Sequence, residues 1–231
     1  MQCKYFIPLL LAAVLLPAKT VAGTILVIGD SLSAAYGLEI QAGWVVLLQQ
    51  RLKAEGYSHQ VVNASISGDT TASGLARLPQ ALNKHRPEIV IIELGGNDGL
   101  RGLPLAQMKH NIAAMITKAR AQGAKVLLVG VLLPPNYGRA YVEKFRAVFR
   151  ELAERYDVPL APFILEGVAT RTDLMQSDGI HPTARAQPIM LDNVWPYLAP
   201  LISGSQAIER PKPRIAGNLI SSGRAALSSE Q

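Results

Sequence analysis

Residues 24–33 read TILVIGDSLS, a nearly all-apolar run that ends abruptly in a polar turn. A continuous apolar run suits a parallel strand covered on both faces, whereas alternation would suit a half-exposed antiparallel sheet. Comparable runs recur along the chain. They span residues 60–64 (QVVNA), 89–94 (IVIIEL), 126–131 (VLLVGV) and 158–161 (VPLA), and the first and last of these four are weaker.

Helix-length amphipathic segments separate these runs. They span residues 43–55, 72–83, 105–122, 139–156 and 183–201. Gly56, Gly123 and Asp157 stand where three of them should end. Alternating strands and helices predict βαβ units, hence an α/β fold with a parallel sheet and helices on both faces. In such folds the functional loops gather beyond the carboxyl ends of the strands.

The two ends of the chain differ from its middle. Lys4, an apolar stretch from Tyr5 to Leu16 and the small residues Thr20-Val21-Ala22 form the pattern of a cleaved signal peptide. The stretch is too short for an ordinary membrane span, and an uncleaved anchor or a buried first strand is the alternative. We therefore expect a signal peptide over residues 1–22, a domain over 23–203 and a flexible Ser/Gly/Ala/Pro-rich tail over 204–231. The protein would be periplasmic or secreted, with no stable membrane anchor after cleavage.

Charge gives little reason to expect an acidic partner. The chain has 23 Lys plus Arg and 17 Asp plus Glu, a net charge of +6. The leader holds two lysines and the tail four basic and two acidic residues, so residues 23–203 keep 17 basic and 15 acidic residues. Their net charge of +2, without a basic stripe or aromatic stacking motif, makes nucleic acid a poor partner. The one cysteine, Cys3, lies in the leader, so thiol chemistry, disulfides and cysteine metal sites are not expected.

The loops expected after the strands carry the parts that acyl transfer requires. Ser31 follows the first strand and could be a nucleophile. Gly68 would let a backbone N–H approach an oxyanion, because it has no Cβ, and Asn97 lies among glycines where its amide could donate to a developing charge. Asp178 and His181, three residues apart, could be presented by one turn as the orienting carboxylate and the general base.

Each residue also has a plainer interpretation when taken alone: Ser31 as a helix cap, and Gly68 and Asn97 as parts of ordinary turns. Asp30 and Asp98 are expected to brace loops rather than to act as catalytic acids.

The remaining histidines, His59, His85 and His110, are expected at the surface. Several apolar residues either line an acyl groove or simply pack in the fold: Tyr36, Leu38, Leu100, Leu103, Pro134 to Tyr137, and Leu174 to Met175.

Four blocks carry a family resemblance: GDSLS (residues 29–33), SGDTT (67–71), GGND (95–98) and DGIHP (178–182). In this order they resemble the GDSL or SGNH hydrolase family, and most of all its bacterial periplasmic thioesterase, lysophospholipase and arylesterase branch. The resemblance spans about residues 24–202. It implies a flavodoxin-like three-layer α/β/α sandwich with a five-stranded parallel sheet. No G-x-S-x-G elbow of the ordinary α/β-hydrolases occurs in the chain.

We accordingly expect a serine esterase that hydrolyses carboxylic esters and thioesters, such as aryl esters, acyl thioesters and lysophospholipids, without metal or cofactor. Ser31, His181 and Asp178 would form the catalytic triad of an acyl-enzyme mechanism. The backbone N–H groups of Ser31 and Gly68 and the amide of Asn97 would form the oxyanion hole. The expected partner is a small-molecule acyl ester or thioester, and the expected state is a monomer.

Two other functions stay open. Asp30, Asn97, Asp98, Asp178 and His181 suggest a metallophosphoesterase, although a two-metal site usually has more histidine and carboxylate ligands. A periplasmic ligand-binding module that keeps the fold without turnover is the second.

Overall fold

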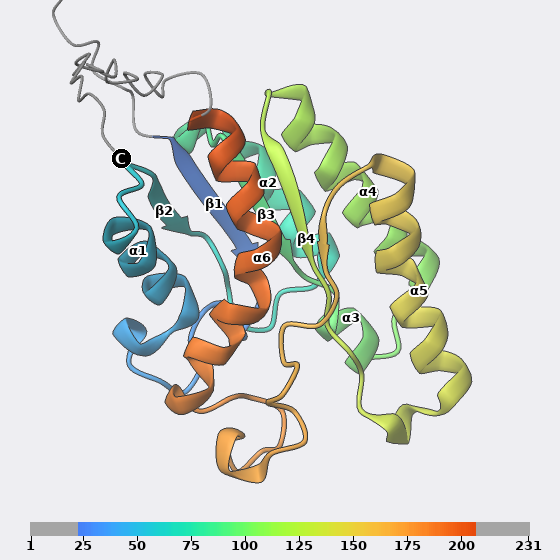
Figure 1. Ribbon diagram of the computed structural model, residues 1–231. Coiled ribbons are helices and arrows are strands. Elements are labelled where there is room, and N and C mark those ends of the chain that lie inside the picture. The colour runs from blue at the N-terminus through green and yellow to red at the C-terminus, as the bar shows by residue number, and fades with distance from the viewer. Residues whose placement is uncertain (1–22, 207–231) are drawn as a thin grey trace, which may run out of the picture.

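Five short strands form the middle layer of the structure, a computed structural model that describes residues 23–206 (Figure 1). All neighbours pair in parallel, in the order β2-β1-β3-β4-β5. This confirms the predicted sheet. The strands are β1 (Thr24–Gly29), β2 (Gln60–Asn63), β3 (Ile89–Glu93), β4 (Lys125–Val129) and β5 (Leu160–Ala161). The expected leader, and the expected tail beyond residue 206, lie outside the described residues.

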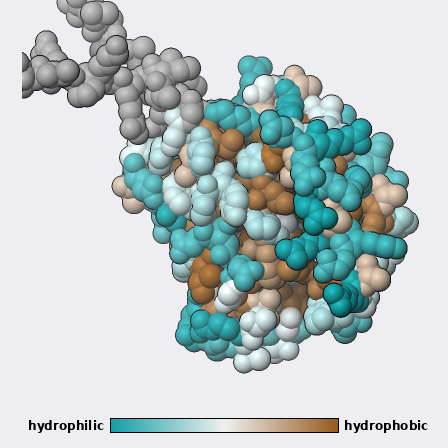
Figure 2. Space-filling view, turned by 45° about the vertical axis from the view of Figure 1, so that its right-hand side comes forward, coloured by the Kyte–Doolittle hydropathy of each residue, from teal (hydrophilic) through white to brown (hydrophobic). Residues whose placement is uncertain are grey.

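Two helical layers cover this sheet (Figure 1). One layer contains α1 (Trp44–Ala54) and α6 (Gln187–Gln206), which contact each other. The other contains α2 (Thr71–His85), α4 (Leu105–Ala121) and α5 (Arg139–Tyr156), of which α4 contacts both others. The predicted three-layer α/β/α arrangement is therefore confirmed. Hydrophilic residues cover much of the face in Figure 2, and hydrophobic residues show in the hollows between them.

The burial of each strand explains its composition. All five residues of β3 are buried, as are five of the six in β1, because helices cover both faces at the centre of the sheet. The edge strand β2 is exposed at both ends, which fits its weaker apolar run. In the register of the central pair, Gly29 of β1 lies beside Glu93 of β3 at the carboxyl edge. This pairing puts a carboxyl group directly under the loop that leaves β1.

Two local predictions were incomplete. The Gly-Gly-Asn-Asp-Gly segment, read as a turn, forms a short helix, α3 (Gly96–Leu100), which Gly95 enters with φ of 121°. The last helix begins at Gln187 after a 3-10 turn over Ala184–Ala186, later than the predicted residue 183.

The predicted surface position of His59 is wrong. Its side chain is only 4% exposed, and Nε2 lies 3.2 Å from Oε2 of Glu88. Glu88 comes 29 residues later in the chain, so local sequence around His59 gave no sign of this partner. His85 is half-buried and His110 is exposed.

Candidate active site

The structure brings together three of the predicted site residues at the carboxyl edge of the sheet. The Oγ of Ser31, in the turn after β1, lies 2.9 Å from Nε2 of His181. The other ring nitrogen of His181, Nδ1, lies 2.6 Å from Oδ2 of Asp178. The three side chains thus form one hydrogen-bonded row, although Ser31 and His181 are 150 residues apart. In such a row the imidazole is placed to take a proton from the hydroxyl.

A tight turn holds the carboxylate and the imidazole. Oδ1 of Asp178 accepts hydrogen bonds from the backbone N–H groups of Ile180 and His181, at 2.9 and 3.0 Å. Gly179, with φ of 66°, allows the chain to reverse direction between Asp178 and His181. The hydrogen bond from the His181 side chain, followed by the two backbone N–H groups, lowers the pKa of Asp178 to about 2. Asp178 is therefore ionised at neutral pH and acts as an acceptor for His181.

Gln176 connects the turn of His181 to the turn of Ser31. Its Nε2 donates to the backbone oxygens of Tyr36, at 2.9 Å, and Pro182, at 3.0 Å. The Tyr36 ring also lies 4.4 Å from the His181 ring, between centroids. Sequence analysis missed the role of Gln176, because nothing near it in the chain indicates a contact with Tyr36.

The turn that carries Gly68 lies beside the end of β1. The backbone N–H of Ile66 donates to the carbonyl of Gly29 at 3.1 Å, and that of Asp69 donates back to Ile66 at 3.1 Å. Gly68 has φ of 84°, a conformation that favours glycine. Within residues 23–206, the N–H groups of Ser31 and Gly68 donate no hydrogen bond. Both remain available to an incoming oxygen.

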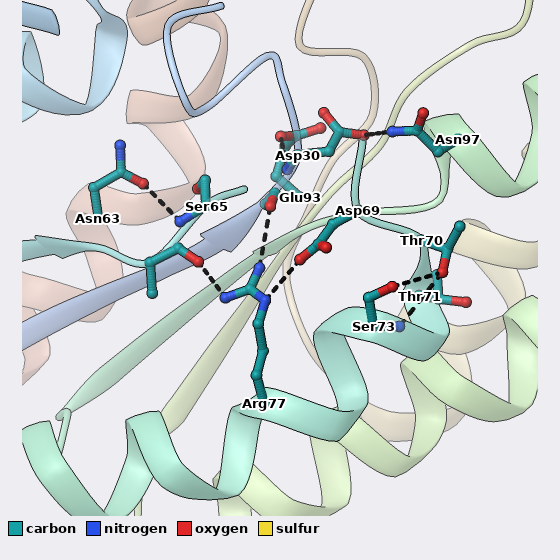
Figure 3. Close-up of polar contacts among 12 residues, drawn as sticks. Asp30, Asn63, Ser65, Asp69, Thr70, Thr71, Ser73, Arg77, Glu93 and Asn97 are labelled. Carbon is teal, nitrogen blue, oxygen red and sulfur yellow. Dashed lines mark hydrogen bonds and ion pairs between the residues drawn. The ribbon is translucent and has the colours of Figure 1, made fainter. Parts of the chain in front are cut away.

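Two charged neighbours fix the direction of the Asn97 amide. Nδ2 donates to Oδ2 of Asp30 at 3.2 Å (Figure 3), and Oδ1 accepts from Nη2 of Arg101 at 3.4 Å. The same Arg101 nitrogen donates to the carbonyl of Gly68 at 3.0 Å. A carboxylate on one side and a guanidinium on the other oppose a flip of the amide, and among residues 23–206 the second N–H of Nδ2 has no acceptor.

Glu93 lies beneath the nucleophile turn and is fully buried. Its Oε2 accepts from the hydroxyl of Ser33 at 2.7 Å and from the backbone N–H of Asp30 at 3.4 Å. Burial raises the pKa of Glu93 well above its usual value, and the nearby Asp30 carboxyl raises it further. Burial also raises the pKa of Asp30 to about 6, against the hydrogen bonds from Leu32 and Asn97 that lower it. A neutral Glu93 can thus brace the turn without a buried charge.

The sequence contained a signal for Glu93 that was not used: a single carboxyl residue inside the apolar run IVIIEL. A buried strand retains such a residue only where it has a polar partner. Asp30 and Asp98, by contrast, brace loops as expected. Asp30 accepts from the Leu32 N–H at 3.1 Å, and Asp98 accepts from the N–H and hydroxyl of Thr71 at 2.8 and 2.6 Å.

The residues considered for an acyl groove separate into two groups. Leu174 is only 2% exposed and belongs to the core, and Leu100 and Met175 are half-buried against it. Tyr36, Leu103 and Tyr137 are exposed, and each lies in a connection that follows a strand. These three remain candidates for contact with a substrate.

A different cavity lies at the opposite edge of the sheet. It has a volume of about 270 Å³, and Arg120, Lys125, Asp157 and Leu201 are among its lining residues. These residues lie at the amino ends of β4 and β5, away from Ser31. Among the residues that the structure describes, no group of three or more His, Cys, Asp or Glu side chains is placed to hold a metal ion. The same residues include no helix long and apolar enough to cross a membrane.

Known proteins share this sequence and fold. The GDSL-like Lipase/Acylhydrolase family matches residues 27–188. The chain is 58% identical over 192 residues to Esterase TesA of Pseudomonas aeruginosa, a match covering 83% of this chain and 96% of that protein. It is 43% identical over 200 residues to Thioesterase 1/protease 1/lysophospholipase L1 of Escherichia coli, covering 87% of this chain and 95% of that protein. The crystal structure of the psychrotrophic esterase EstA from Pseudoalteromonas sp., inhibited by monoethylphosphonate, matches with a TM-score of 0.75 at 41% identity. That match covers 78% of this chain and 99% of EstA.

The raised pKa of Glu93 predicts how stability depends on pH. A carboxyl whose pKa is higher in the folded chain stabilises the fold below its ordinary value, 4.5, and this contribution is lost as the pH rises through the folded pKa. Glu93→Gln removes the titration. The free energy of unfolding of E93Q, relative to the wild type, should therefore increase from about pH 4.5 to about pH 8. Urea unfolding at both pH values measures this difference.

Any constant cost of the new amide cancels in that comparison, because it is the same at both pH values. A difference between E93Q and the wild type that does not change with pH would contradict the assignment of a neutral, buried Glu93.

Proposed function

Since the chain belongs to the GDSL-like Lipase/Acylhydrolase family and is a carboxylic ester hydrolase, we propose that it is a serine esterase with Ser31 as nucleophile. The hydrogen-bonded row from Ser31 through His181 to Asp178 carries this proposal. Nucleophilic catalysis by a hydroxyl needs a base within hydrogen-bond reach and a third group that orients the base. The distances of 2.9 and 2.6 Å in this row meet both needs.

In the first half of the reaction, His181 takes the proton of Ser31 as its oxygen attacks the acyl carbonyl. Asp178 stabilises the resulting imidazolium and keeps its own negative charge, in keeping with a pKa of about 2. His181 then gives the proton to the leaving alcohol or thiol, which leaves an acyl group on Ser31. Water repeats the sequence on this ester, and the acid departs from the regenerated serine.

The oxyanion hole consists of the N–H groups of Ser31 and Gly68 and the Nδ2 of Asn97. The free backbone donors and the fixed direction of the Asn97 amide support this assignment. Donors that are already oriented need little reorganisation when negative charge forms on the carbonyl oxygen.

The substrate class is an apolar acyl ester or thioester. The relatives are named as an esterase and as a thioesterase and lysophospholipase. The surface around the site supports an apolar acyl group, because each of the five connections that follow a strand exposes a large hydrophobic side chain. These side chains are Tyr36, Ile40, Ile66, Leu103, Tyr137 and Ile180.

Replacement of the nucleophile tests the reaction. Ser31→Ala should lower the hydrolysis of a p-nitrophenyl acyl ester by about 10⁴-fold or more, because no other group can form the acyl-enzyme. The same assay over esters and thioesters of increasing chain length defines the acyl preference, with S31A as the blank.

Three outcomes distinguish the alternatives. Substantial activity in S31A would remove Ser31 as nucleophile. A wild-type protein that Ser31-directed alkylphosphonate fails to label would favour a non-catalytic binding module, and activity abolished by a strong chelator would favour the metallophosphoesterase.

Replacement of Asn97 should lower activity less than replacement of Ser31. Asn97→Ala removes one preorganised donor and should lower kcat by about 10²–10³-fold, with a much smaller change in KM. The change should fall on kcat rather than on KM because the donor interacts most strongly with the charged transition state. An unchanged kcat in N97A would place the oxyanion elsewhere.

The proposal also includes export of the protein with removal of its leader. The leader pattern of residues 1–22 supports cleavage after Ala22 and a location in the periplasm or outside the cell. Intact-mass measurement of the exported protein should give a chain that begins at Gly23. A mass that retains the leader would show an uncleaved segment instead.

A further inference from the structure

We infer that Arg77 is a positioning residue for the oxyanion hole, holding the turn that presents the Gly68 N–H. The inference rests on the function proposed above. Arg77 lies on α2, outside the four sequence blocks, and its side chain is 21% exposed. Its guanidinium reaches back under the carboxyl edge of the sheet, as Figure 3 shows.

The guanidinium binds three acceptors, two in the connection between β2 and α2 and one at the end of β1. Nε donates to Oδ2 of Asp69 at 2.6 Å, Nη1 donates to the carbonyl of Ala64, and Nη2 donates to the carbonyl of Gly29 at 3.3 Å. Asp69 directly follows Gly68, and Ala64 directly follows β2. One planar group therefore holds both ends of the Gly68 turn.

The third acceptor relates this turn to the nucleophile. Gly29 is the last residue of β1, two positions before Ser31, and its carbonyl also accepts the Ile66 N–H at 3.1 Å. Through Arg77 and Ile66, the Gly68 turn is attached to the strand end from which Ser31 projects. The distance between the two backbone donors of the proposed oxyanion hole depends on this attachment.

The side chain of Asn63 makes a second link between the two connections, those after β1 and β2. Its Nδ2 donates to the carbonyl of Ser33 at 2.8 Å, and its Oδ1 accepts the Ser65 N–H at 3.1 Å. This link fixes only the first residues of the turn. Arg77 is the contact that reaches past Gly68, to Asp69.

The opposite donor, the Asn97 amide, depends on residues other than Arg77. Asn97 is oriented by Asp30 and Arg101. Arg101 also donates to the carbonyl of Gly68 at 3.0 Å, so loss of Arg77 would leave that contact but would free the Ala64 and Asp69 ends of the turn. The Gly68 N–H could then shift relative to Ser31, and the donors would converge less well. A misplacement of about 1 Å at a reacting centre can cost about 10²-fold in rate.

Lysine cannot replace this arginine. A guanidinium has five donors fixed in one plane, so it can serve acceptors in several directions at once, whereas an ammonium is a compact point charge on a flexible stem. In Arg77→Lys, the charge near Asp69 is kept but the contacts to the carbonyls of Ala64 and Gly29 cannot all be made. R77K thus tests the hydrogen-bond geometry of Arg77 while its positive charge is kept.

The experiment compares R77K with R51K in the full-length mature protein. Arg51 also holds more than one acceptor, the carboxylates of Glu55 at 2.9 Å and Asp192 at 2.8 Å, but it lies on α1, away from the proposed active site. Hydrolysis of a p-nitrophenyl acyl ester by R77K should lose about 10- to 10²-fold in kcat with little change in KM. The rate at which a p-nitrophenyl alkylphosphonate reacts with Ser31 should fall by a similar factor, because that reaction also forms a charged oxygen in the hole. R51K should keep wild-type values.

A rescue experiment distinguishes a positioning role of Arg77 from a role in stability alone. Added guanidinium ion should restore part of the kcat of Arg77→Ala, since it can occupy the vacated site. A lower Tm for R77K with wild-type kcat at a temperature where it is folded would overturn the inference.

If R77K does not fold, Asp69→Asn provides a second test, because it weakens one of the three contacts. This variant should show a smaller fall in kcat, and an unchanged kcat would overturn the inference as well. The S31A variant separates the two proposals: an active S31A refutes the proposed function, whereas an inactive S31A with a fully active R77K refutes only the role of Arg77.

Discussion

The parallel pairing of β1 with β3 is the constraint on which the rest of the site depends. Parallel strands bring all their carboxyl ends to one edge, so residues from distant segments meet there without any direct connection between them. The register places Gly29 beside Glu93, and a polar group in the core thereby supports the turn of Ser31. The same edge receives the turn of His181, which Gln176 attaches to the backbone of Tyr36.

Buried polar groups make this edge rigid, but their burial lowers the free energy of unfolding. A buried carboxyl without full hydrogen bonding opposes folding unless it is neutral, which is the form that the raised pKa of Glu93 favours. Within residues 23–206, Oε1 of Glu93 has no hydrogen-bond partner. The large apolar core of the central strands offsets such costs. The fold therefore tolerates a poorly satisfied carboxyl beneath the Ser31 turn, at the edge where a function needs fixed donors.

The sequence predicted the architecture well and the supporting contacts poorly, for a physical reason. Strands and helices follow from local periodicity. Ser31, Gly68 and Asn97 follow from blocks in the connections after strands, and Asp178 and His181 follow from a block just before the last helix. Glu93, Arg77 and Gln176 contact Ser33, Gly29 and Tyr36, which are 60, 48 and 140 residues distant, and two of these contacts are to backbone carbonyls that have no signature in the sequence. His59 was misplaced for the same reason, because its neighbour Glu88 is distant in the chain. Local patterns can identify a side chain with a chemical role, but a bracing side chain is defined by where its partners lie.

The two sides of the proposed oxyanion hole are held by different chemistry. The guanidinium of Arg77 holds the two ends of the Gly68 turn and that of Arg101 holds the Gly68 carbonyl, whereas the side-chain amide of Asn97 is held by Arg101 and by the Asp30 carboxyl. Asp30 has a pKa of about 6, so its charge, unlike that of Arg77, changes within the pH range in which esterases are commonly assayed. A protonated Asp30 is a weaker acceptor for Nδ2 and no longer opposes a flip of the amide as strongly. The Asn97 side of the hole is therefore the side whose alignment is sensitive to acid, and the Gly68 side is held by a group that stays charged throughout.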